Sequence, residues 1–121
     1  MRFIDNKNGT ITDTETGLMW QQETLSTMSY DNAVLTCSEL DLAGYKDWRC
    51  PTISELLTIV DYTRSKPACD PVFKAQSSYY WSSSTYQNLP SHAWTVSFYV
   101  GGTNYDYKTD GYHVRAVRAG S

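Results

Sequence analysis

The stretch Ala93-Trp94-Thr95-Val96-Ser97-Phe98-Tyr99-Val100 gives the clearest secondary-structure signal in the sequence. Large apolar residues alternate along it with small or polar ones, which is the two-residue period of a β-strand. A strand of this kind has one face in the core and one face open. The sequence therefore predicts a core face of Trp94, Val96, Phe98 and Val100, and an open face of Ala93, Thr95, Ser97 and Tyr99.

Further strands are expected on both sides of this stretch. Aromatic and β-branched residues at positions 79–85 favour a strand that precedes it. After a Gly101-Gly102 turn and a polar, Tyr-rich loop, residues 113–118 favour a last strand. Near the N-terminus, the Asn8-Gly9 turn signal lies between short segments of β character and predicts a β-meander.

Two helices are expected between the meander and the later strands. Ser29 can cap a helix over residues 30–42, which Gly44 would end. Thr52 and Glu55 have the spacing of a capping box and predict the start of a second helix. These elements predict an α+β domain with two helices packed on an antiparallel β-sheet. A length of 121 residues fits one domain over residues 1–121.

The charge and apolar patterns limit the partners. The chain carries 10 Lys and Arg against 13 Asp and Glu, for a net charge of −3, and the bases form no cluster that would favour nucleic acid. Apolar runs are a few residues long, whereas a membrane span needs about 20. The N-terminus has no apolar signal-peptide core. We expect a domain excised from a larger secreted protein, located at the cell surface or outside the cell.

The usual signatures of catalysis and metal binding are incomplete. His92 and His113 lack the spacing of a helical metal site, and the serines at 82–84 lack the glycines of a nucleophile elbow. Three residues near one another could offer oxygen ligands to calcium, although each is also a common turn former: Asn104, Asp106 and Asp110. We expect no enzyme activity, no cofactor and no metal.

The three cysteines allow at most one intrachain disulfide. Cys37 lies on the apolar face of the first predicted helix, whereas Cys50 and Cys69 flank the second helix in loops that can approach one another. A Cys50–Cys69 disulfide would imply an oxidising compartment. The alternative, three free thiols, would leave the compartment open.

Tyrosine is concentrated in the last third of the chain. Seven of the ten Tyr residues follow position 75, interleaved with Ser, Thr, Asn and Gly, which is the mixture that recognition surfaces favour. The alternative is that Tyr favours half-buried strands. We expect a ligand-binding face made of Tyr86, Asn88, Thr95, Ser97, Tyr99, Tyr105, Tyr107 and Tyr112.

A series of motifs runs in order along almost the whole chain: Arg2-Phe3-Ile4-Asp5-Asn6, Asn8-Gly9-Thr10-Ile11-Thr12-Asp13, Thr16-Gly17-Leu18-Met19-Trp20, Ala43-Gly44-Tyr45-Lys46-Asp47-Trp48-Arg49, Pro51-Thr52, Glu55-Leu56, Tyr80-Trp81-Ser82-Ser83, Ala93-Trp94, Phe98 and Val114-Arg115-Ala116-Val117-Arg118. In these motifs the chain resembles the Lcl C-terminal domain family, named after the C-terminal domain of a bacterial collagen-like adhesin. The resemblance implies a core that contains Trp20, Trp48, Trp81, Trp94 and Phe98.

The resemblance also implies a C-type-lectin-like fold, used as a terminal module of bacterial surface and secreted proteins. The namesake adhesins bind sulfated glycans. It further implies kinship with the variable proteins of diversity-generating retroelements, which present diversified side chains from such a scaffold. The family usually has aliphatic residues at the positions of Cys50 and Cys69, and finding Cys at both supports their pairing.

Two features of the sequence limit the class of ligand. The C-terminal stretch has no strong basic surplus, which argues against sulfated glycans, and the tripeptides of calcium-dependent sugar-binding lectins are missing. Our hypothesis is a non-catalytic adhesion domain of a bacterial or phage surface protein that binds a glycan or protein ligand. One alternative is a structural tip or oligomerisation module that forms a homo-oligomer. Another is an enzyme related to the formylglycine-generating oxidases, which depend on reactive cysteines.

Overall fold

The computed structural model describes residues 2–120, which form two short helices and two β-sheets. The elements follow one another as β1 Phe3–Asp5, β2 Thr10–Asp13, β3 Leu18–Gln21, β4 Leu25–Met28, α1 Tyr30–Ser38, α2 Ile53–Leu57, β5 Tyr79–Thr85, β6 His92–Ser97, β7 Thr103–Tyr107, β8 Tyr112–Val114 and β9 Val117–Ala119. The predicted α+β class is confirmed. None of the helices among these residues is long and apolar enough to cross a membrane.

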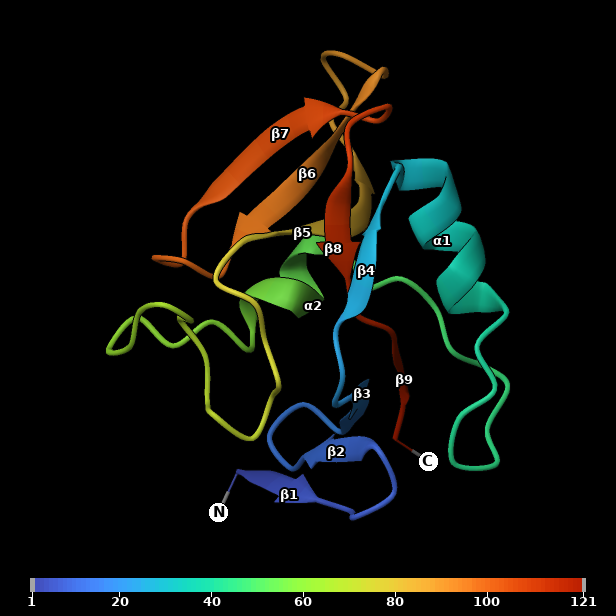
Figure 1. The fold of residues 1–121 in the computed structure, drawn as a ribbon, viewed down its shortest axis with the longest axis vertical. Helices are drawn as coiled ribbons and strands as arrows, with labels where there is room; N and C mark the ends of the chain where they lie inside the picture. Colours follow the sequence, from blue (N-terminus) through green and yellow to red (C-terminus); the bar gives the residue numbers. More distant parts are fainter. Residues whose placement is uncertain (1, 121) are drawn as a thin grey trace.

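The two sheets occupy opposite ends of the molecule (Figure 1). One has the strand order β1-β2-β3-β9 and lies beside both chain termini, and the other has the order β4-β8-β5-β6-β7. All neighbouring strands are antiparallel except β5 and β8, which are parallel. The prediction of a single last strand over residues 113–118 is wrong, because this segment forms two separate strands, β8 and β9. Each of these strands joins a different sheet, so the C-terminal segment connects the two sheets.

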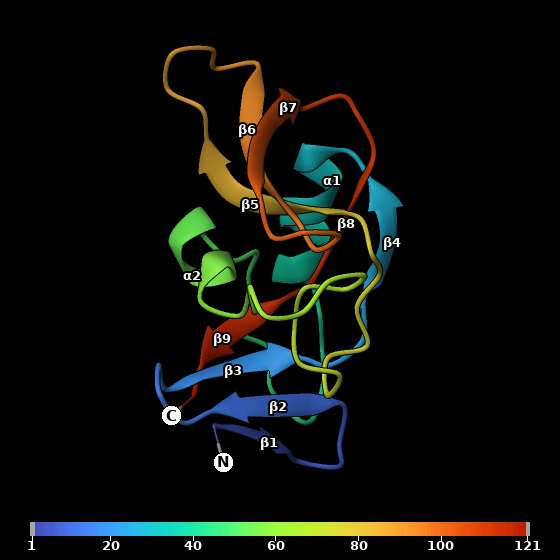
Figure 2. The same ribbon diagram turned by 90° about the vertical axis from the view of Figure 1, so that its left-hand side faces the viewer.

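Both helices begin at the predicted caps, and α1 is shorter than expected. The Ser29 side chain accepts a hydrogen bond from the Asn32 backbone N–H, and α1 ends at Ser38. The reciprocal hydrogen bonds of the Thr52–Glu55 capping box are both present at the start of α2. Both helices pack against β5, α1 with β8 and α2 with β6 (Figure 2). The helix expected over residues 30–42 gives way to a Leu42–Tyr45 bridge.

Two buried clusters lie on opposite sides of the strands. Tyr80 packs in the cluster that contains Leu56 of α2, whereas the next residue, Trp81, packs in the cluster that contains Cys37 of α1. Neighbouring strand residues point to opposite faces, so β5 is covered on both sides. Four of the five aromatic residues expected in the core are buried, and the fifth, Trp94, is half-buried.

The thiols of Cys37, Cys50 and Cys69 are free and buried, so the expected Cys50–Cys69 disulfide is not formed. Cys50 lies in the same cluster as Cys37, and Cys69 lies in the other cluster. The loops that flank α2 therefore lead their cysteines to opposite sides of the strands. Proximity along the chain on either side of a short helix was not enough to bring the two thiols together.

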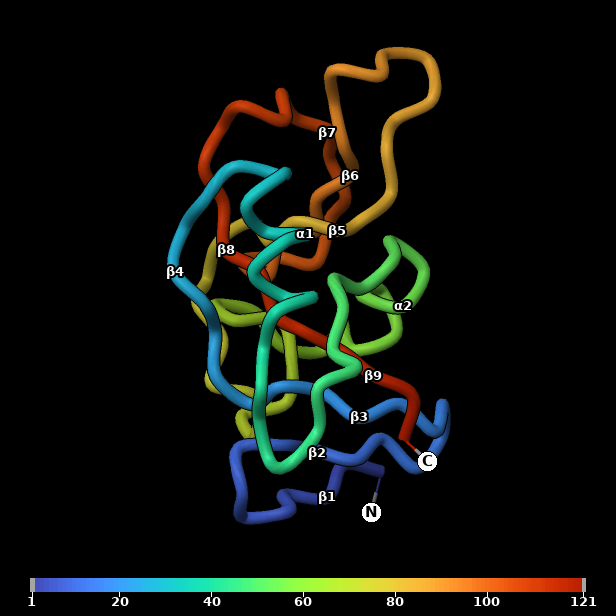
Figure 3. Tube along the Cα trace, turned by 90° about the vertical axis from the view of Figure 1, so that its right-hand side faces the viewer, coloured from blue at the N-terminus to red at the C-terminus, as the bar shows by residue number. Residues whose placement is uncertain are grey.

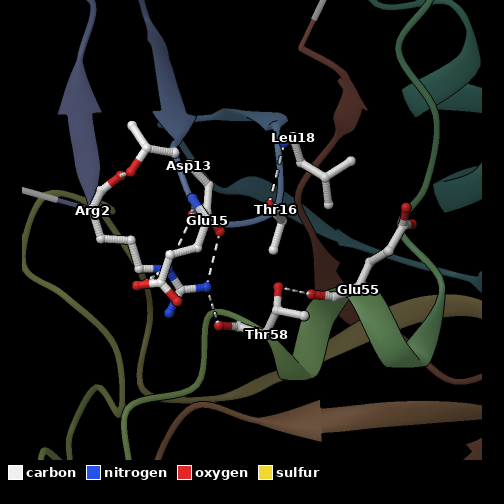
Figure 4. A network of polar contacts seen from close by, with 8 residues as sticks. Arg2, Asp13, Glu15, Thr16, Leu18, Glu55 and Thr58 are labelled. Atoms are coloured by element: carbon white, nitrogen blue, oxygen red, sulfur yellow. Dashed lines mark hydrogen bonds and ion pairs between the residues drawn. The ribbon is translucent and has the colours of Figure 1, made fainter.

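Besides the pairing of β3 with β9, Arg2 and Gly9 attach the N-terminal meander to the rest of the domain. Arg2 forms a two-pronged hydrogen bond with the buried Asp13 carboxylate, and its Nη2 also donates to the Thr58 carbonyl 2.8 Å away, just after α2 (Figure 4). The segment that follows α1 runs toward β2 (Figure 3). There Gly9 has a φ of +88°, and a Cβ at this position would lie 3.3 Å from the Leu42 side chain.

Candidate aromatic binding face

The Tyr-rich segment expected to be a loop contains strand β7, which pairs with β6. The register places His92 opposite Tyr107 and Trp94 opposite Tyr105. Side chains directly opposite one another in an antiparallel pair lie on the same face of the sheet. The alternation Tyr105-Asp106-Tyr107 therefore puts both tyrosines on one face and the aspartate on the other.

Tyr86, at the start of the loop after β5, completes an aromatic cluster on this face. Its ring stacks on Tyr105 with the centroids 4.0 Å apart and the planes 3° from parallel. The Trp94 ring lies nearly perpendicular to both, at 5.1 Å from Tyr86 and 5.8 Å from Tyr105. The ring centroids of His92 and Tyr107 are 4.1 Å apart. We call these five residues the aromatic patch: Tyr86, His92, Trp94, Tyr105 and Tyr107.

A depression of about 370 Å³ adjoins the aromatic patch. Its lining combines two aromatic rings of the patch, the first residue of α2 and the polar end of β5 with the following loop: Ile53, Ser84, Thr85, Tyr86, Gln87, Asn88 and Trp94. Small-molecule sites commonly have volumes of about 300–1,000 Å³. The depression is therefore large enough for a small ligand or for one unit of a larger one.

Backbone hydrogen bonds close the loop that carries this lining. The Tyr86 N–H donates to the His92 carbonyl at 2.9 Å, and the His92 N–H donates to the Leu89 carbonyl at 2.8 Å. Ser84 Oγ accepts a hydrogen bond of 3.0 Å from the Ile53 N–H at the start of α2. The loop extends beyond the end of the five-stranded sheet (Figure 2). Its base is thus fixed to both β6 and α2.

The sequence was compared with models of protein families. The model of the Lcl C-terminal domain matches residues 9–118. The chain belongs to the Lcl C-terminal domain family. This family is found in bacterial proteins. No curated protein matches the chain.

In this member of the Lcl C-terminal domain family, the structure separates the eight residues expected to form one face. Tyr86, Asn88, Tyr105 and Tyr107 lie at the aromatic patch or its depression. Thr95 and Ser97 are buried, although their face of β6 was expected to be open, and Ala93 on the same face packs in the cluster that contains Cys37 of α1. The hydroxyl of Thr95 donates to Asp106 Oδ2 at 2.9 Å.

The remaining two expected residues lie elsewhere. Tyr112 packs against Trp81 at 5.1 Å, and burial together with a hydrogen bond to Asp106 raises its pKa to about 12. Tyr99 lies in the turn at the far end of the β6–β7 hairpin, where Lys66 Nζ is 5.1 Å from its ring. Val100, expected in the core, is exposed beside it.

Two residues of the aromatic patch were missed by the sequence analysis. Trp94 was assigned to the core face of the strand, and His92 was considered only as a metal ligand, for which its spacing is unsuitable. Both lie on the same face of β6 as the buried Val96, so the predicted alternation of faces is correct. The sequence does not show that this face of β6 is less buried at Trp94 than at Val96. Nor does it show that β7 places Tyr105 and Tyr107 beside Trp94 and His92.

A second depression, of about 500 Å³, lies between β1 and the segment after α2. Its charged residues already have partners, since Arg2 is paired with Asp13, and Asp61 accepts hydrogen bonds from Thr63 and Arg64. Within residues 2–120 there is no cluster of three or more His, Cys, Asp or Glu side chains suited to a metal ion. The aromatic patch is therefore the better candidate site.

Proposed function

We propose that this domain is a non-catalytic binding module that recognises a glycan or protein ligand through the aromatic patch and the adjoining depression. The observation that carries the proposal is the exposure of two of its rings, while Tyr86 and Trp94 are half-buried and His92 is buried. Tyr105 and Tyr107 are 41% and 59% exposed, although each contacts another ring of the patch. Exposed, mutually supported aromatic rings give large contact area at small entropic cost.

The finer description of the scaffold is part of the same proposal. We infer a C-type-lectin-like fold from the family together with the two short helices packed on two sheets. The buried residues, which we call the frame, support the patch with its Tyr, Trp and His rings, and Asn88 lines the adjoining depression, as expected for kinship with diversified variable proteins. A binding module of this type suits the surface of a bacterial or phage protein. Multivalent display on such a parent would strengthen weak single-site binding.

The state of the thiols supports a non-catalytic role. A catalytic cysteine needs an exposed thiol with a lowered pKa. Burial raises the pKa of Cys69 to about 11, and the neighbouring Cys37 side chain together with burial raises the pKa of Cys50 as well. All three thiols are enclosed in the two core clusters.

The test is a binding screen with the domain displayed multivalently on beads against arrays of glycans and extracellular proteins, with and without calcium. Hits are measured again with Tyr105→Ala and with Tyr99→Ala as the matched control. These two tyrosines are similarly exposed, at 41% and 45%, but Tyr105 lies within β7 opposite Trp94, whereas Tyr99 lies in the turn between β6 and β7. We expect only Tyr105→Ala to remove binding. Hits that survive Tyr105→Ala would contradict the proposed site, and concentration-dependent self-association without hits would favour the oligomerisation module.

A further inference from the structure

The lining of the depression contains no charged side chain. Its polar members are Ser84, Thr85, Tyr86, Gln87 and Asn88, and the others are Ile53 and Trp94. Sulfate and carboxylate groups are normally held by Arg, Lys or clustered N–H donors. An anionic group in this depression would lose water without gaining a counter-charge. The lining therefore favours an uncharged ligand.

The two rings of the lining are fixed in place. Tyr105 covers one face of the Tyr86 ring, so a ligand can meet only the opposite face and the edges of that ring. Trp94 is held nearly perpendicular to the two tyrosines. A rigid aromatic corner of this kind suits the flat C–H face of a sugar ring, which loses little entropy on docking.

Polar groups beside the rings are available to a ligand. The Thr85 hydroxyl and the side-chain amides of Gln87 and Asn88 line the depression, and none of them hydrogen-bonds to another residue within residues 2–120. An amide offers both a donor and an acceptor, and a hydroxyl does the same. Sugar hydroxyl groups also need both kinds of partner. The chemistry of the rim is thus complementary to an uncharged polyol.

The size of the depression suits a single sugar unit. A volume of about 370 Å³ fits one ring-sized group, with the exposed Tyr105 and Tyr107 beside it for neighbouring units. We propose that the ligand is a neutral glycan, with one uncharged pyranose unit seated in the depression against Tyr86 and Trp94. This inference rests on the proposed function and narrows its ligand class.

The test uses neutral tetrasaccharides of glucose, galactose, mannose and N-acetylglucosamine, each paired with its sulfated form. Binding to the ¹⁵N-labelled domain is followed by NMR through the Trp94 indole N–H. We expect at least one neutral tetrasaccharide to give a saturable shift of the Trp94 signal that is insensitive to salt, and its sulfated form to bind more weakly. Replacing the exposed Gln87 and Asn88 together with Ala should weaken binding roughly tenfold, whereas Tyr99→Ala should leave it unchanged.

Tighter, salt-dependent binding of the sulfated forms would overturn the inference, and so would the absence of any neutral-sugar shift at millimolar concentrations. These failures differ from failure of the proposed function. If a protein or sulfated ligand from the array still requires Tyr105, the site stands and only the ligand class is wrong. If ligands bind independently of Tyr105, the site itself is wrong.

Discussion

The four-stranded sheet and the outer β6–β7 hairpin are built from different interactions. In and around the four-stranded sheet, charges are paired: Arg2 with Asp13, and Arg118 with Asp47 at 2.6 Å. On the hairpin, aromatic rings contact one another, and no ion pair within residues 2–120 involves β5, β6 or β7. The frame contains ion pairs between specific partners, whereas the patch consists of aromatic rings that contact one another.

Substitutions in the two regions should therefore affect the stability of the fold differently. A buried charge that loses its partner is left desolvated, so frame substitutions should destabilise the fold. A half-exposed ring that is removed leaves a surface that water can cover. The aromatic patch should therefore tolerate substitutions that change its ligand, while the frame should not.

The largest difference in the free energy of unfolding is expected between substitutions of two tryptophans on paired strands. Trp81 is fully buried, and its indole N–H donates to the Met28 carbonyl at 2.8 Å, whereas Trp94 is half-buried. We expect Trp81→Ala to lower the free energy of unfolding by about 3–5 kcal/mol. Trp94→Ala should lower it distinctly less. Urea denaturation followed by circular dichroism measures both, and equal losses would place Trp94 in the core and contradict the division of the molecule into frame and patch.

The next largest loss of stability is expected on substitution of Asp13. Its carboxylate accepts hydrogen bonds from Arg2 and from the Glu15 backbone. Burial would raise the pKa of Asp13, but these hydrogen bonds outweigh it and lower the pKa below the usual value. We expect Asp13→Asn to lower the free energy of unfolding by about 2 kcal/mol at neutral pH.

The sign of the pH dependence follows from the lowered pKa of Asp13. Stability from a carboxylate of this kind is present above its unfolded-state pKa, about 3.9, and is lost as the pH falls through the lower folded-state pKa. The gap between wild type and Asp13→Asn should therefore be full at pH 7 and shrink in acid. Chemical denaturation across that range measures the gap, with Asp110→Asn on the exposed surface as control. A gap that does not change with pH would show that the Arg2–Asp13 pair does not stabilise the frame.

The sequence predicted the features that depend on local patterns. The Thr52–Glu55 capping box, the Ser29 cap and the strand at 79–85 each involve residues close in the chain, and all are present in the structure. The family motifs also identified most of the aromatic core. Local physics was sufficient because capping and alternation require no knowledge of distant partners.

The predictions about the site that are wrong concern which elements cover each face of a strand. Thr95 and Trp94 are neighbours on opposite faces of β6, and Thr95, expected to be open, is buried and hydrogen-bonded to Asp106 of β7, whereas Trp94, expected in the core, is half-buried. Tyr105 and Tyr107 came together with Trp94 through the β6–β7 register, which the sequence alone did not reveal. The same reason explains the cysteines, since the pairing of Cys50 with Cys69 depended on how the chain passes around the strands.

If the patch is the binding site, binding and folding use different residues, and the smallest expected effect on stability tests this division most directly. The free energy of unfolding and the retention of an array ligand are measured on the same preparations of Tyr105→Ala and the similarly exposed Tyr99→Ala. We expect both variants to unfold within about 1 kcal/mol of wild type, and only Tyr105→Ala to lose the ligand. Loss of the ligand in both variants, or in neither, would contradict the division.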